Sequence, residues 1–185
     1  MQYGYQVYDL NTASDVAKKV LEQVKRHYQF IPNALGAMVE SPEAVRAYLT
    51  LDELVAENSL TAEQRHVVFL TIAREYSCSY CVAAHTAFAQ MGQVDGEYIQ
   101  QLREGETISD PKLAALQQFV RKLVRNDCHV SEQDINSFLM QGYSRKNVLE
   151  IITMMANKLI AVFANRVMGT DLDAALEPAA WKQAV

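Results

Sequence analysis

Residues 75–85 read EYSCSYCVAAH and contain two of the three cysteines and one of the four histidines of the chain. Cys78 and Cys81 form a Cys-x-x-Cys pair, and His85 follows four residues after the second cysteine. If residues 78–90 are helical, the two sulfur atoms and the imidazole fall within about 60° of one another, because an α-helix turns about 100° per residue. This stretch therefore predicts a dithiol with a nearby base at the start of a buried core helix.

The spacing suits thiol redox chemistry, in which the thiolate and not the thiol is the nucleophile. An unperturbed cysteine has a pKa of about 8.5, so a neighbouring group must favour the thiolate at neutral pH. Cys78 would lie near a helix N-terminus, where the dipole favours a thiolate, and His85 would lie one turn beyond Cys81 and could take its proton. The second sulfur would close a disulfide once the first is oxidised. The residues thus predict dithiol peroxidase or disulfide reductase chemistry.

Three other interpretations of the same residues differ in strength. A structural zinc site normally has four ligands, and no second ligand pair with suitable spacing follows this one. A c-type haem requires histidine directly after the second cysteine, where Val82 stands, so haem is excluded. Buried cysteines that merely pack inside a helical protein remain the alternative without chemistry. We expect no bound metal and no organic cofactor.

Composition limits the class of protein. The chain has 185 residues, of which 50% are hydrophobic and 21% charged, as expected for a single globular domain. A net charge of −5 argues against nucleic acid or an anionic membrane as partner. No uninterrupted apolar run approaches the roughly 20 residues of a membrane span, and the first residues lack the pattern of a signal peptide. We therefore expect a cytoplasmic protein, in which Cys-x-x-Cys is more often catalytic or metal-binding than a structural disulfide.

Apolar residues recur with helical spacing along the chain, and no stretch alternates as a β-strand does. This pattern predicts one all-α domain over residues 1–185, with an N-terminal arm at 1–12 and a loosely held tail at 170–185. The broad apolar face of residues 146–167 predicts either a helix that crosses the core or one that meets another subunit. The expected helices run over residues 14–27, 33–39, 42–55, 61–72, 78–90, 98–102, 111–124, 131–140 and 146–167.

Several short motifs resemble one family in the same order along the chain. They are IPNAL at 31–35, SP at 41–42, LTAEQR at 60–65, CSYCVAAH at 78–85, ANR at 164–166 and TDLD at 170–173. With these motifs the chain resembles the carboxymuconolactone decarboxylase superfamily, and specifically its AhpD-like alkylhydroperoxidase branch, over roughly residues 30–178.

The resemblance implies an AhpD-like fold of orthogonally packed helices and a homo-oligomer, a trimer or a hexamer. It also implies reduction of hydroperoxides through a cysteine sulfenate and an intramolecular disulfide. In the family the second cysteine, here Cys81, meets the peroxide, the first, here Cys78, resolves it, and His85 matches the histidine of the proton relay. The helix dipole instead favours Cys78 as the more acidic thiol, so the two arguments assign the roles differently.

One position departs from the family. AhpD has a relay glutamate twelve residues before the first cysteine, and His66 stands there in this chain. A histidine can still transfer protons near neutral pH. Glu75, three residues before Cys78, and Glu63 are the carboxylates that could replace the relay glutamate, although each could also be a solvated residue near a helix end. The histidine that AhpD carries between its two cysteines is replaced by Tyr80.

These observations lead to one main hypothesis and two alternatives. The main one is a thiol-dependent hydroperoxide or disulfide reductase of antioxidant defence that uses Cys78, Cys81 and His85, with an organic hydroperoxide as oxidant and a lipoyl or thioredoxin-like dithiol as electron donor. The alternatives are a decarboxylase-type lyase acting on a small carboxylated lactone and a non-enzymatic redox sensor. Cys128, in an expected loop, is interpreted as an incidental or structural cysteine, with a regulatory thiol as the alternative.

Overall fold

The structure is a computed structural model that describes residues 1–182. Within these residues it contains helices and no β-strand, which confirms the all-α prediction. The helices are α1 (Asp15–Tyr28), α2 (Asn33–Met38), α3 (Pro42–Ala56), α4 (Ala62–Glu75), α5 (Ser79–Met91), α6 (Gly96–Glu104), α7 (Pro111–Arg125), α8 (Glu132–Met140), α9 (Arg145–Met168) and the 3₁₀ helix η1 (Ala174–Ala179).

Local signals in the sequence set where the helices begin. The Thr61 hydroxyl accepts a hydrogen bond from the Gln64 backbone N–H at 3.2 Å, and the Gln64 side chain accepts from the Thr61 N–H at 2.9 Å. This reciprocal cap satisfies two backbone donors that the first turn of α4 would otherwise leave unpaired. Ser144 and Asn147 form the same arrangement at the start of α9. Because such caps involve residues only three apart, they are determined by local sequence.

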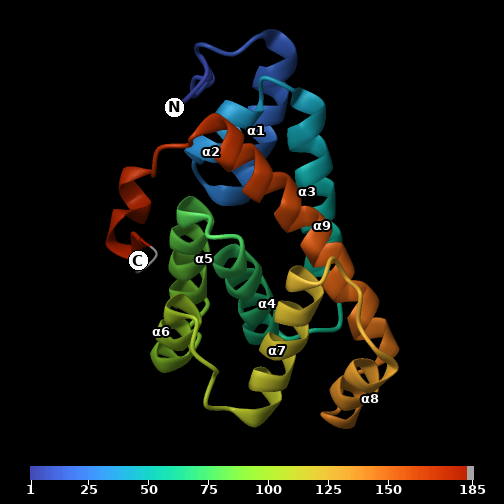
Figure 1. Ribbon diagram of the computed structural model, residues 1–185. Helices are drawn as coiled ribbons and strands as arrows, with labels where there is room; N and C mark the ends of the chain where they lie inside the picture. The colour runs from blue at the N-terminus through green and yellow to red at the C-terminus, as the bar shows by residue number, and fades with distance from the viewer. Residues whose placement is uncertain (183–185) are drawn as a thin grey trace.

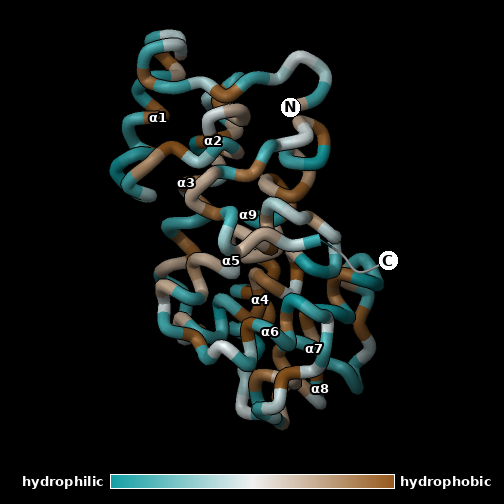
Figure 2. Tube along the Cα trace, turned by 90° about the vertical axis from the view of Figure 1, so that its left-hand side faces the viewer, coloured by the Kyte–Doolittle hydropathy of each residue, from teal (hydrophilic) through white to brown (hydrophobic). Residues whose placement is uncertain are grey.

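The helices form two packed groups that α9 connects (Figure 1). One hydrophobic cluster is built around α4, α5 and α7, and the other around α1, α2 and α3. The long helix α9 contributes Ile151 and Met154 to the first cluster and Ala161 and Met168 to the second. Hydrophobic residues run along α4 in the middle of the molecule (Figure 2), where α4 packs against α5, α7 and α9.

Helix α9 has 24 residues and is long and apolar enough, by length and composition, to cross a membrane. In this fold it is a core helix, because Ile151, Met154 and Val162 are fully buried against the neighbouring helices. Helix α9 therefore crosses the core, which was one of the two expectations for residues 146–167. The same helix also leaves large apolar side chains exposed, among them Leu149 at 67% and Phe163 at 48%.

The C-terminal segment differs from the sequence-based expectation. Residues 170–182 are docked rather than loosely held, and the rest of the predicted tail, residues 183–185, lies outside the described residues. Leu176 and Ala179 of η1 are buried, and η1 packs on α5. Asp173 accepts hydrogen bonds from the Tyr80 hydroxyl at 2.6 Å and from the Asn33 backbone N–H at 2.9 Å. The sequence did not show this packing because the residues that hold the tail in place are far away along the chain. Such contacts leave no periodic pattern in the tail itself.

Candidate active site

The cysteine pair lies at the junction of α4 and α5. Ser77 adopts a left-handed backbone conformation with φ of 50°, which turns the chain between the two helices. Cys78 is the N-cap of α5, and its sulfur accepts a hydrogen bond from the Cys81 backbone N–H at 3.3 Å. The two residues are joined as a disulfide, with their Cα atoms 5.2 Å apart. The predicted redox pair therefore lies at the start of a core helix, as expected.

The second cysteine lines a pocket. Cys81 faces this cavity of about 40 Å³, whereas Cys78 is not among the residues that line it. The Asn165 side-chain amide of α9 donates to the Cys81 sulfur at 3.5 Å. Asn165 belongs to the ANR motif quoted above, but only the fold shows that it contacts the sulfur. Such an amide stabilises negative charge on that sulfur more than on a neutral thiol.

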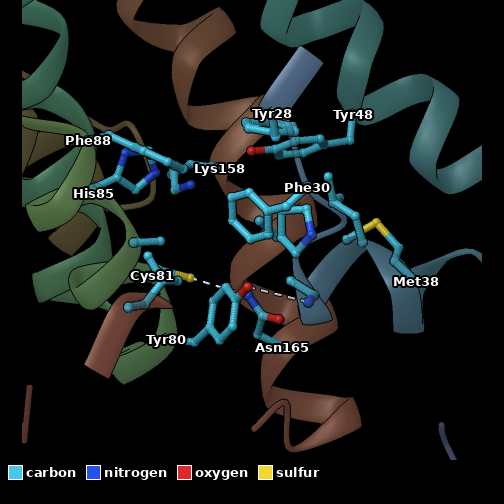
Figure 3. A pocket seen from close by; sticks show the side chains of 16 residues that line it. Tyr28, Phe30, Met38, Tyr48, Tyr80, Cys81, His85, Phe88, Lys158 and Asn165 are labelled. Carbon is cyan, nitrogen blue, oxygen red and sulfur yellow. Dashed lines mark hydrogen bonds between the residues drawn. The ribbon is translucent and has the colours of Figure 1, made fainter. Parts of the chain in front are cut away.

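The cavity lies where α1, α2 and α3 meet α5 across α9. Apolar and aromatic side chains form most of its wall, and one charged side chain interrupts them (Figure 3). Its lining residues are Tyr28, Phe30, Pro32, Ala34, Leu35, Met38, Tyr48, Tyr80, Cys81, Ala84, His85, Phe88, Lys158, Ala161, Asn165 and Leu176.

His85 lies one turn after Cys81 on the same helix and lines the same cavity. Its ring stacks on Phe69 with centroids 4.8 Å apart, and Phe88 approaches it edge-on. Burial, the nearby charge of Lys158 and then His66 lower the pKa of His85 well below its usual value of about 6.5. His85 is therefore a neutral imidazole at pH 7, and the same burial makes it a weaker base than an exposed histidine.

Lys158 is the site residue that the sequence analysis missed. It is 2% exposed, and its ammonium group lies over the Phe69 ring at 5.3 Å from the centroid. Burial lowers the pKa of this lysine from 10.5 to about 8, an effect that Asp52 partly opposes. A signal was present: Lys158 follows Ile151 by seven residues and Met154 by four, so it occupies a core position of the α9 stripe.

Buried polar groups flank the cavity on α1 and α3. The Tyr28 hydroxyl donates to Asp52 at 3.1 Å, and His27 forms an ion pair with the same carboxylate at 3.0 Å. Burial and the nearby Tyr48 raise the pKa of Tyr28. Burial and then Asp52 raise the pKa of Tyr48. Both tyrosines therefore remain neutral hydroxyl groups far above physiological pH.

Residues 42–117 of this chain match the carboxymuconolactone decarboxylase family. The match agrees, over these residues, with the resemblance to this family seen in the sequence. No curated protein matches the chain significantly in sequence. The matched segment of the carboxymuconolactone decarboxylase family contains both cysteines and His85, whereas Lys158 and Asn165 lie beyond its end.

Solved structures share this fold at low sequence identity. The AhpD core of a peroxidase-related protein from Ralstonia eutropha JMP134 aligns with a TM-score of 0.81 at 19% identity, over 93% of this chain and 93% of that one. A peroxidase-related protein from Silicibacter sp. TM1040 aligns with a TM-score of 0.75 at 17% identity, over 94% and 95%. The debrominase Bmp8, solved in complex with 2,3,4-tribromopyrrole, aligns with a TM-score of 0.80 at 16% identity, over 97% and 96%. The AhpD-like fold is thus established.

The predicted relay residues are not brought together at the cavity. Glu75 forms ion pairs with Arg125 at 2.7 Å and with Arg121 at 3.2 Å, and it does not line the cavity. The Glu75 carboxylate, which was expected next to the thiols, therefore pairs with two arginines of α7 instead. Glu63 lies in the first turn of α4 and lines a separate surface groove.

His66 lies behind the cavity wall, close enough to His85 to influence it electrostatically. Burial, and then the charge of Arg65, lower the pKa of His66. Its Nδ1 atom is buried without a hydrogen-bond partner among residues 1–182, and its Nε2 atom lies 3.0 Å from where a Cβ on Gly92 would stand.

Two further expectations concern metal and the third cysteine. In the part of the chain that the structure describes, no three His, Cys, Asp or Glu side chains are grouped so that they could hold a metal ion. Cys128 is an exposed free thiol with φ of 62°, in the turn after α7. It lies outside the cavity.

Proposed function

We propose that the protein is a thiol-dependent hydroperoxide reductase that cycles between the Cys78–Cys81 disulfide and the dithiol. The observation that carries this proposal is the position of Cys81. Its sulfur faces a largely apolar pocket, a neutral histidine lies one turn away, and the partner sulfur is bonded to it in the disulfide.

The proposed cycle begins with the dithiol. His85 takes the proton of the Cys81 thiol, and the thiolate attacks one peroxide oxygen, so that an S–O bond forms and the O–O bond breaks. The leaving alkoxide takes a proton and departs as an alcohol. Cys78 then attacks the Cys81 sulfur, the S–S bond forms and water leaves. The two electrons that reduce the peroxide come from the dithiol, and an external dithiol restores them.

The geometry supports Cys81 as the cysteine that meets the peroxide and Cys78 as the one that resolves the sulfenate. Cys81 has the cavity, the Asn165 amide at 3.5 Å and His85 one turn away. Cys78 has only the N-terminal position on α5, which lowers the pKa of a thiol and makes it ready to attack once Cys81 is oxidised.

We propose a lipoyl group as electron donor in preference to a thioredoxin-like protein. Cys78 and Cys81 are 4% and 2% exposed, so a slender dithiol on a flexible arm reaches the disulfide more readily than the surface of a folded protein does. We also propose a cytoplasmic location, where reduced dithiols are available.

A homo-oligomer is proposed as the working state. The exposed apolar side chains of α9, including Leu149, Ile152, Phe163 and Val167, support a subunit interface on this helix. Analytical ultracentrifugation tests the assembly: a trimer or hexamer is expected, and a monomer at micromolar concentration would contradict it.

A second candidate function is reductive dehalogenation of a small aromatic compound. It uses the same electrons, because a dithiol and an aryl halide yield the arene, a disulfide and a hydrogen halide. The aromatic rings of Tyr28, Phe30 and Phe88 in the cavity favour a flat apolar substrate, and the debrominase Bmp8 has the same fold. Two alternatives do not involve catalytic cycling of the thiols. A decarboxylase-type lyase would not oxidise them, and a redox sensor would not reduce a substrate repeatedly.

A thiol titration before and after one equivalent of cumene hydroperoxide tests the main proposal. The reduced protein is expected to lose two thiols and to show a Cys78–Cys81 link in peptide mapping. Cys81→Ser should abolish the reaction and Cys78→Ser should stop it at the sulfenate, while Cys128→Ser serves as the matched control and reacts normally. Two free, unreactive thiols in the folded protein would refute the reductase and favour the lyase.

A further inference from the structure

A single cation is buried in the wall of the Cys81 cavity. Lys158 is 2% exposed, and the other cavity-lining residues carry apolar, aromatic, hydroxyl, amide, thiol or imidazole groups. Within residues 1–182, Lys158 forms no ion pair, and no group accepts a hydrogen bond from its ammonium nitrogen. The ammonium group instead makes a cation–π contact with the Phe69 ring. The cavity therefore contains a charge whose hydrogen-bonding capacity the protein does not use.

The helices around Lys158 offer few groups that could act as a counter-charge. Asp52 of α3 is the carboxylate that affects Lys158, but it is already bonded to the Tyr28 hydroxyl of α1 and paired with His27. His85 of α5 is neutral at pH 7. Tyr48 of α3 is a neutral hydroxyl group. The surrounding elements thus leave the ammonium group without a close anion.

The Cys81 sulfur has a different partner. It accepts from the Asn165 amide at 3.5 Å, and no hydrogen bond joins it to Lys158 in the described structure. Figure 3 shows Lys158 beside His85 on one wall of the cavity, with the Phe30 ring opposite and Cys81 toward the other end. A molecule in the cavity can therefore touch Lys158 and Cys81 at two separate points.

A buried ammonium ion without a counter-ion is unfavourable, and an anionic group that enters the cavity supplies the missing partner. A carboxylate suits this role because it accepts short, charge-assisted hydrogen bonds from ammonium. The remainder of the wall is mostly aromatic and aliphatic, so it would contact the apolar body of such a ligand.

We propose that Lys158 is a specificity-determining residue that binds the carboxylate of a small ligand with an apolar or aromatic body, whose other end faces Cys81. This inference rests on the proposed function only in taking the Cys81 cavity as the substrate site. It predicts a preference for acids, for example hydroperoxides that carry a carboxylate, over neutral compounds.

The test compares a carboxylate with its neutral isostere. Benzoate and benzamide have nearly the same shape, and their affinities for the oxidised protein, measured by NMR titration, require no turnover. We expect benzoate to bind at least tenfold more tightly than benzamide at pH 7. In Lys158→Met the ratio should fall to about one. Lys146→Met, the same change at an exposed position of α9, is the matched control and should keep the preference.

A pH series provides a second measurement that needs no variant. Lys158 loses its proton as pH rises through about 8, so the preference for benzoate should be lost by pH 9.5. Tyr28, Tyr48 and Tyr80 remain neutral because the pKa of each is raised, and His85 is neutral throughout. The disulfide has no titrating thiol, and benzamide affinity monitors any general effect of pH.

Equal affinities for benzoate and benzamide in the wild-type protein, or a preference that survives in Lys158→Met, would overturn the inference. A preference that persists unchanged at pH 9.5 would do the same. Thiol oxidation by cumene hydroperoxide, which is neutral, is measured separately. If that oxidation fails while the benzoate preference holds, the proposed function falls and the anion site stands; the opposite pattern rejects only the anion site.

Discussion

Replacing the buried lysine is expected to stabilise the protein even though it removes a binding group. The pKa of Lys158 is about 8 in the folded state, against 10.5 for an unperturbed lysine, a difference of about 2.5 units (10.5 − 8). Since one unit corresponds to about 1.4 kcal/mol, the charge disfavours the folded state by about 3 kcal/mol at pH 7. Loss of the cation–π contact with Phe69 offsets about 1 kcal/mol, and methionine fills a similar space. Lys158→Met should therefore raise the free energy of unfolding by about 2 kcal/mol.

The sign of the pH dependence gives a second part of this prediction. The folded pKa of Lys158 is lower than the unfolded one, so between about pH 8 and 10.5 the unfolded chain binds more protons than the folded one. The lysine's unfavourable contribution is complete below pH 8 and disappears as pH rises through this window. The stability advantage of Lys158→Met over wild type should therefore shrink between pH 7 and pH 9.5.

Urea denaturation followed by circular dichroism at these two pH values measures both quantities. The exposed Lys146→Met variant serves as the control and should match wild type within about 0.5 kcal/mol. The reasoning is refuted if Lys158→Met is less stable than wild type at pH 7 with an unchanged m-value, or if its advantage is the same at both pH values.

Three further outcomes are expected. Tyr80→Phe should lower stability by about 2 kcal/mol in urea denaturation, because it removes a buried hydrogen bond to the Asp173 carboxylate; an unchanged midpoint would contradict the docking of the C-terminal segment. The folded pKa of His85 is below its unfolded value, so wild type should lose up to about 1.4 kcal/mol per pH unit as pH falls below 6.5, and His85→Gln should show a shallower loss. Glu75→Gln should cost about 1–2 kcal/mol through its ion pair with Arg125 but leave the rate of thiol oxidation within twofold of wild type; a large loss of rate would restore Glu75 as a relay residue.

Helix positions were predictable where the determining contacts are local. Thr61 and Gln64 cap one another across three residues, and the proline that opens α3 stands at a position where its missing N–H has no effect. The tail was predicted wrongly because Asp173 binds Tyr80, 93 positions away, and no local pattern reports such a partner.

The site, too, was predictable only where its residues belong to one helix. The relation of Cys81 to His85 follows from one turn of one helix, so it was visible in the sequence. Glu75 was equally near in sequence, yet it lies at the end of α4 and pairs with Arg125 of α7. Nearness along the chain is informative within one helix and loses its meaning across a helix boundary.

By itself, the sequence determined an all-α fold, a resemblance to one family and a cysteine pair at the start of a core helix. All three depend on helical periodicity, end caps and motif spacing, which are properties of neighbouring residues. Only the tertiary structure decided that the Asn165 amide of α9 contacts the Cys81 sulfur, and that Lys158, Tyr28 and Phe30 line the same cavity. The physical reason is that burial and electrostatic environment arise from how separate helices pack, and a linear pattern does not specify which of their faces meet.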